Sequence, residues 1–136
     1  MSYGVAQALQ EAVYVRLMAD TAVTDLVGAA VFDVIPAGDV PPLYVALGAE
    51  VVRDKSDSTG GGAEHEFTVS VVTHNAGFSS AKAVAAVVSD ALIDAPLTLA
   101  RGTLVGLHFY RARAARVGTG DERQINLIFR ARVCDG

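Results

Sequence analysis

The chain has no tryptophan, a single cysteine and few aromatic side chains, which make up 7% of its 136 residues. Most of its apolar residues are alanine and valine. This composition predicts a modest core of many small side chains, and it favours closely packed interfaces between chains. The length fits one domain with one hydrophobic core.

A lone cysteine, Cys134, cannot form a disulfide within the chain, so cysteine usage gives no sign of an oxidising compartment. With no reactive environment evident around it, we interpret Cys134 as an incidental thiol rather than a nucleophile. The first residues lack the basic and apolar regions of a signal peptide, and no run approaches the ~20 apolar residues of a membrane helix. We therefore expect folding in the cytoplasm and no membrane partner.

Basic charge is also scarce: 11 lysines and arginines face 15 acidic residues, for a net charge of −4. Proteins that grip phosphate backbones usually carry a basic surplus or a basic stripe. The balance argues against a dedicated nucleic-acid binder. It remains compatible with a weakly acidic surface past which DNA slides.

Signatures of catalysis, metals or cofactors are missing as well. The glycines at 60–62 lack the following Lys-Ser/Thr of a phosphate-binding loop and precede a strand rather than a helix. The polar residues from Asp54 imitate a calcium loop, but Thr59 stands where the turn glycine belongs and His65 where the bidentate glutamate belongs. The histidines show no metal-binding spacing. We predict no cofactor, no metal and no catalytic residue.

Helical periodicity covers two segments. Residues 4–19 repeat apolar side chains at i, i+3, i+4 and i+7, and a second stripe follows Ser79 or Ser80, either of which can cap the helix. This second helix should stop at Asp94-Ala95-Pro96. A short turn at residues 24–27 should end at Gly28.

Strand patterns cover residues 43–52, 64–73, 104–113 and 123–133, with a brief one at 31–34. Gly48 marks a bulge in the first of these, and His65 is interpreted as part of a solvated strand start. Val105, Leu107 and Phe109 are expected to share one face. The sum is an α+β fold: an antiparallel sheet of about four strands with two helices packed on one face.

The most conspicuous feature is the arm, residues 53–63, with the sequence RDKSDSTGGGA. It is polar and rich in glycine, so we expect it to be mobile until a partner orders it. Long loops inside compact domains are usually functional or disordered.

Arginines concentrate on the last two predicted strands. They form either a solvated sheet face or a subunit interface in which guanidinium groups meet carboxylates of a neighbour. The interface hypothesis includes these residues: Arg53, Asp54, Lys55, Asp57, Glu64, Arg111, Arg113, Arg130 and Arg132.

Three pieces of sequence carry a resemblance to a known family: PLYVALG at residues 42–48, HEFTVSV at residues 65–71, and the helix that begins near Ser79. Together with the order of the elements over nearly the whole chain, they resemble the tail-terminator or tail-completion family. Proteins of this family occur in long-tailed bacteriophages and in phage-derived gene transfer agents.

The resemblance implies a non-enzymatic homo-oligomeric ring in the virion, usually a hexamer, at the head-proximal end of the tail tube. Such a ring halts tube growth and contacts the tail tube protein and the head-completion or connector protein, while DNA passes through its lumen without specific binding. Two alternatives stay open: a head–tail connector or minor tail protein, and a small α+β enzyme or ligand-binding domain.

Overall fold

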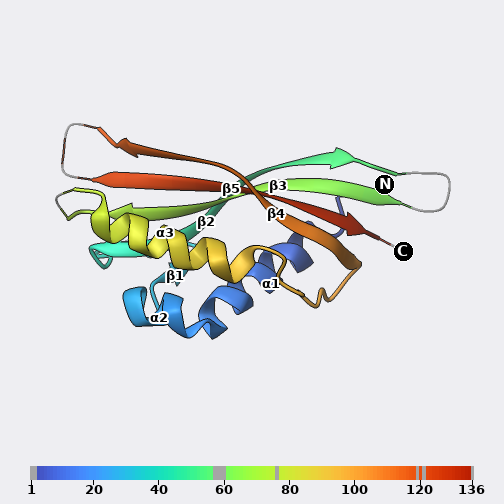
Figure 1. Ribbon diagram of the computed structural model, residues 1–136, viewed down its shortest axis with the longest axis horizontal. Coiled ribbons are helices and arrows are strands. Elements are labelled where there is room, and N and C mark those ends of the chain that lie inside the picture. Colours follow the sequence, from blue (N-terminus) through green and yellow to red (C-terminus); the bar gives the residue numbers. More distant parts are fainter. Residues whose placement is uncertain (1–2, 57–60, 76, 119, 121, 136) are drawn as a thin grey trace.

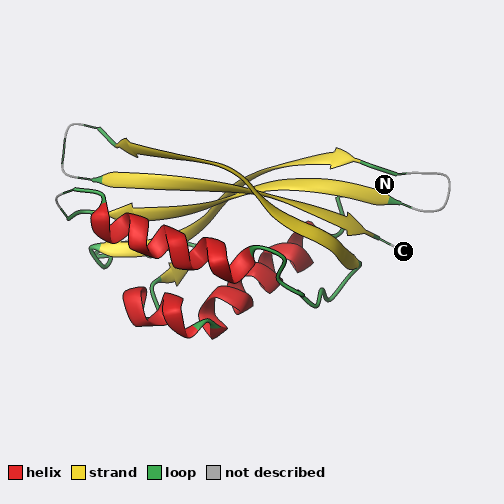
Figure 2. Ribbon diagram, viewed as in Figure 1, coloured by secondary structure: helices red, strands yellow, loops and turns green. Residues whose placement is uncertain are grey.

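A computed structural model describes residues 3–56, 61–75, 77–118, 120 and 122–135. Three helices, α1 (Ala6–Ala19), α2 (Thr21–Val27) and α3 (Ser79–Leu92), lie on one face of a single sheet (Figures 1 and 2). The five strands of the sheet are β1 (Val31–Phe32), β2 (Leu43–Asp54), β3 (Gly62–Thr73), β4 (Thr103–Arg116) and β5 (Arg123–Cys134).

The strands are arranged in the order β1-β2-β3-β5-β4. All neighbours pair antiparallel except β1, which runs parallel to β2. The predicted α+β class is therefore correct, and the brief strand expected at residues 31–34 is present as β1. The sheet is mixed rather than antiparallel, and three helices rather than two lie on its face. The two residues of β1 are too few to show a direction or a period in the sequence.

The helix α2, where the sequence predicted only a short turn, is longer than that turn because it has its own start signal. The side chain of Asp20 accepts a hydrogen bond from the backbone N–H of Val23 at 3.1 Å, which caps the helix. The helix ends at Gly28, whose φ of +62° favours glycine, as expected. By contrast, α3 begins at Ser79 after Phe78, without the side-chain cap that the sequence suggested.

The core lies between the helices and the central strands β3 and β5. The buried positions of these strands alternate as predicted, and the buried stripes of α1 and α3 cover them. Phe129 is the largest fully buried side chain, and its ring lies 5.7 Å from that of Phe67 and 5.9 Å from that of Phe109.

The edge strand β4 departs from the simple alternation expected for it. The pairing with β5 shifts between Leu104 and Gly106 and again between Phe109 and Arg111, so two bulges interrupt the strand. Leu107 is buried, whereas Val105 and Phe109 are exposed. The predicted common face is therefore wrong for Val105, which lies in the first bulge. The bulge predicted at Gly48 is present, since the register of β2 shifts between Leu47 and Glu50.

The arm is shorter than its sequence suggested. Arg53 and Asp54 continue β2, while Gly62 and Ala63 begin β3, and Ala63 is buried against Val5. The polar character of this segment hid the strand ends because a two-stranded extension exposes most of its side chains. Residues 57–60 at the centre of the arm lie outside the described residues.

We expect Phe129→Ala to lower the free energy of unfolding by about 3–5 kcal/mol, since it leaves a cavity between two aromatic rings and the helices. Phe109→Ala is the matched control: its ring is partly exposed, so the loss should be only about 1–2 kcal/mol. Urea unfolding followed by circular dichroism measures both. Equal losses would contradict the central position assigned to Phe129.

Candidate functional site

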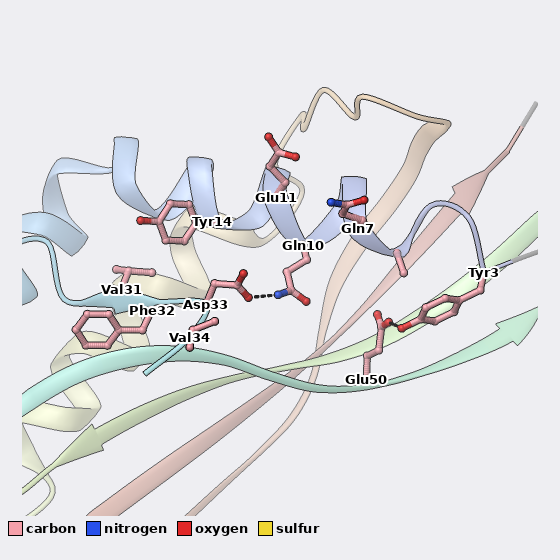
Figure 3. Close-up of a pocket in the computed structure, with 11 residues that line it drawn as sticks. Tyr3, Gln7, Gln10, Glu11, Tyr14, Val31, Phe32, Asp33, Val34 and Glu50 are labelled. Atoms are coloured by element: carbon pink, nitrogen blue, oxygen red, sulfur yellow. Dashed lines mark hydrogen bonds between the residues drawn. The ribbon is translucent and has the colours of Figure 1, made fainter. Parts of the chain in front are cut away.

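A groove of about 770 Å³ runs between α1 and the sheet edge formed by β1 and β2. Figure 3 shows Gln10 and Tyr14 of α1 on one side and Phe32, Asp33 and Glu50 on the other. Its remaining lining residues are Tyr3, Ala6, Gln7, Glu11, Val31 and Val34. We call it the acidic groove, because three carboxylates and no lysine or arginine are among its lining residues.

The carboxylates inside the acidic groove are held by neutral donors. The Asp33 side chain accepts a hydrogen bond from the amide of Gln10, and the Glu50 carboxylate accepts one from the hydroxyl of Tyr3 (Figure 3). The hydrogen bond and the charge of Glu50 both raise the pKa of the Tyr3 hydroxyl. The amide and hydroxyl donors carry no charge, and no lysine or arginine lines the groove beside these carboxylates.

His65 lies behind this groove and corrects an expectation from the sequence. It was interpreted as solvated, but it is 0% exposed, and its Nδ1 lies 3.4 Å from Oε2 of Glu50. Its Nε2 is buried and has no hydrogen-bond partner among the described residues. The alternation of β3 puts His65 on the same face as Phe67, which explains the burial.

The sheet face away from the helices carries a second cluster of charges. The Nε of Arg130 lies 3.2 Å from Oε1 of Glu66 and 3.9 Å from Oε1 of Glu64, and its guanidinium stacks 3.5 Å from the ring centroid of Tyr110. Burial acts to lower the pKa of Arg130, but Glu66, Tyr110 and Glu64 outweigh it and raise that pKa. The cluster ties β3, β5 and β4 together.

The residues of the interface hypothesis divide into two groups. Some find partners within their own chain: besides the contact of Arg130 with Glu64, Nη2 of Arg132 donates to the carbonyl of Lys55 at 3.2 Å. Ser56 donates its hydroxyl and its N–H to Asp54 at 2.6 and 3.0 Å, which lowers the pKa of that carboxyl. Arg53 lies opposite Glu64 in the strand register. Asp57 lies outside the described residues.

Arg111 and Arg113 form the other group. Both lie on the edge strand β4 and are exposed. The guanidinium of Arg111 lies 5.9 Å from the ring centroid of Tyr110, and Arg113 makes no hydrogen bond or ion pair within the described part of the chain. No contact with Asp54 or Glu64 of the same chain is present for either.

The described residues contain no group of three or more side chains that could hold a metal ion, and none of their helices is long and apolar enough to cross a membrane. The described residues present an acidic groove at one sheet edge, a charged outer face, and an arginine-bearing strand at the other edge. Exposed sheet edges and complementary charge are features of a protein that assembles with other chains.

Comparison with known proteins agrees with that class. The family model described as "Tail completion protein gp17" matches residues 11–134. The chain therefore belongs to the tail completion protein family. Among solved structures, it is similar to a chain of the "Virion of native gene transfer agent (GTA) particle", with 57% identity, a TM-score of 0.94, and coverage of 98% of this chain and 99% of that one. The comparison with curated proteins gave no match.

Sequence reasoning missed the acidic groove. Its lining comes from the first helix turns, the strand β1 and the middle of β2, which are far apart in the chain. The only local signal is Asp33, a charge placed directly after the apolar pair Val31 and Phe32. A groove of this kind depends on tertiary packing rather than on a motif.

We expect Arg130→Met to lower the unfolding temperature, because it removes an ion pair and a cation–π contact that join three strands. Arg132→Met is the matched control, since its side chain makes one hydrogen bond to a carbonyl among the described residues; its effect on the unfolding temperature should be smaller. Thermal unfolding of both variants tests this. A larger effect at Arg132 would contradict the cluster.

Proposed function

We propose that this chain forms a ring, of six copies, at the head-proximal end of the tail tube, where it ends tube polymerisation and joins the tail to the head connector. The observation that carries the proposal is the similarity over nearly the full length of both chains to a chain of the gene transfer agent virion. The family match over residues 11–134 supports the same role. The protein acts in the virion, through contacts rather than catalysis.

Ring formation needs a surface on each side of the subunit. The sheet offers such surfaces because its edges, β1 with β2 and β4, lie at opposite ends of the strand order (Figure 1). Contacts between two different surfaces of the same chain generate rings when the rotation between copies closes. The outer strand β4 carries Arg111 and Arg113, which we propose as interface residues.

The hairpin between β2 and β3 supplies a further contact. Its described part includes Arg53, Asp54, Lys55 and Glu64, and we propose that it reaches a neighbouring subunit or the last ring of the tube. Arg130 and Arg132 already have partners in their own chain. The hydrogen bond from Arg132 to the backbone carbonyl of Lys55 holds the base of this hairpin. Their role at the interface is therefore to position the hairpin.

Deleting the gene tests the function directly. Electron microscopy of the producing cells should then show DNA-filled heads beside unattached tails of irregular length, because nothing ends tube growth or joins the two parts. Expression of the wild-type chain from a plasmid is the control and should restore joined particles. Tails of normal length that remain unattached would favour the alternative role of a head–tail connector. Intact tailed particles would contradict both the terminator role and the connector role.

Shortening the hairpin tests its contact. Replacing residues 56–61 with Asn-Gly joins Lys55 to its partner Gly62 through a two-residue turn and keeps the strand register, so the protein should fold while tails fail to join heads. A Gly-Ser segment of the original length is the matched control for chain length against side-chain chemistry. Circular dichroism checks the fold, and counts of joined particles measure the effect. Normal joining by the short variant would refute this contact.

A further inference from the structure

The large apolar side chains that stay exposed are not spread evenly over the described surface. One group lies at or near the acidic groove and the neighbouring part of β2, and a second group lies on or beside β4. The first group comprises Tyr3, Val34, Ile35 and Val51, and the second comprises Val105, Phe109, Tyr110 and Val117. The other exposed large apolar side chains are Val15, Leu26 and Ile93, on or directly after the helices. Exposed apolar patches of this kind mark contact surfaces.

The same two places carry opposite charge. The acidic groove has Asp33 and Glu50 inside and Glu11 at its rim, and its lining includes no lysine or arginine. On β4, exposed Arg111 and Arg113 flank Ala112, and Arg116 follows at the end of the strand. Each surface therefore combines apolar side chains with one sign of charge, and the signs are complementary.

Both places are also unfinished sheet edges. Within the described residues, β1 pairs with β2 only at Val45 and Ala46, so the outer edge of β2 is open from Leu47 to Asp54. On β4, the carbonyl of Leu107 accepts a hydrogen bond from the backbone N–H of Asp94 at 3.1 Å. Beyond Leu107 the outer edge of β4 is open within the described residues, since β5 is its single strand neighbour in the described sheet. An open edge offers backbone N–H and C=O groups to a strand of another chain.

We propose that β4 of one copy docks along the acidic groove and the open edge of β2 of the next copy, with Arg111 and Arg113 facing the groove carboxylates. This inference rests on the proposed ring and identifies the contact that builds it. The occupant is a second copy of this chain because the two complementary surfaces occur on every subunit, at opposite edges of one sheet. Repeating the contact leaves neither surface free in a closed ring.

The contact differs from the interface hypothesis drawn from the sequence in its acidic side. That hypothesis paired the arginines with Asp54, Asp57 or Glu64 of a neighbour. In the structure, Glu64 lies near Arg130, and Asp54 accepts two hydrogen bonds from Ser56. The carboxylates of the acidic groove have only neutral donors among the described contacts, apart from the neighbouring His65, so they are the better partners for arginine.

Site-directed cross-linking tests the contact. In a Cys134→Ser background, which is free of cysteine, one chain carries both Ala115→Cys on β4 and Val34→Cys at the groove. Ala115 lies on the same face of β4 as Arg113 and is partly exposed, and Val34 is exposed. A short bismaleimide is added to the purified protein and to particles. We expect a ladder of covalent oligomers that ends at the size of the ring. Each single-cysteine chain is the matched control and should give no covalent oligomer on a denaturing gel.

Three other outcomes overturn the proposal. Dimers from a single-cysteine chain would show that a surface pairs with its own copy. A ladder from Ala115→Cys with Lys55→Cys, but none with Val34→Cys, would place β4 against the hairpin instead. If cross-linked oligomers form neither in the purified protein nor in particles, the proposed contact is refuted. Because this readout does not depend on tail joining, it can succeed or fail separately from the gene deletion.

Charge reversal gives an independent check. Arg111→Glu with Arg113→Glu in one chain, or Glu11→Lys with Asp33→Lys in another, should each reduce the ring population at least tenfold. Mixing the two variant chains should restore rings, because they can alternate with opposite charges at every contact. Asp25→Lys with Asp90→Lys is the matched control on exposed helix positions and should leave rings intact. Failure of the mixture to recover while both chains remain folded would contradict the proposed pairing.

Discussion

The packing of β3 and β5 against α1 and α3 is the constraint on which the rest of the structure depends. Alternate side chains of these two strands point to the helices, with Phe129 at the centre, and the alternation sends the remaining side chains to the outer face. A shift of either strand by one residue would expose the core and bury charges such as Glu66 and Arg130. The register of these two strands therefore determines both which side chains form the core and which charges lie on the outer face.

The helices cover only the centre of the sheet and leave its edge strands exposed. The helices pack most closely on the central strands, while β4 and the outer part of β2 extend beyond them (Figure 2). A monomeric protein normally protects such edges with charge, bulges or proline. Here the bulges and arginines of β4 protect it from random pairing, yet its apolar side chains remain exposed. The strand β4 therefore both discourages unspecific strand pairing and keeps apolar side chains available for a specific partner.

The sequence predicts those parts of the fold whose signal is local and periodic. The stripes of α1 and α3 and the alternation of β3 and β5 show directly in the order of residues. The strand β1 is too short to have a period, and the burial of His65 depends on the face of β3 that the core selects. The acidic groove is still less predictable, because distant segments form it. Of the arginines noticed in the sequence, only the structure separates Arg130 and Arg132, which make hydrogen bonds inside the chain, from Arg111 and Arg113, which make none among the described residues.

The chemistry of the two edges fits an assembly that must wait for its template. Exposed ion pairs contribute little affinity, about 0–1 kcal/mol each, but they steer approach and fix register. Apolar contacts such as those of Phe109 and Val34 add affinity, against the entropy lost when two free chains associate. One such contact is therefore weak, whereas a subunit held by two neighbours and a tube end binds through several at once. In the proposed ring, weak edges favour closure at a tail end, which supplies the remaining contacts.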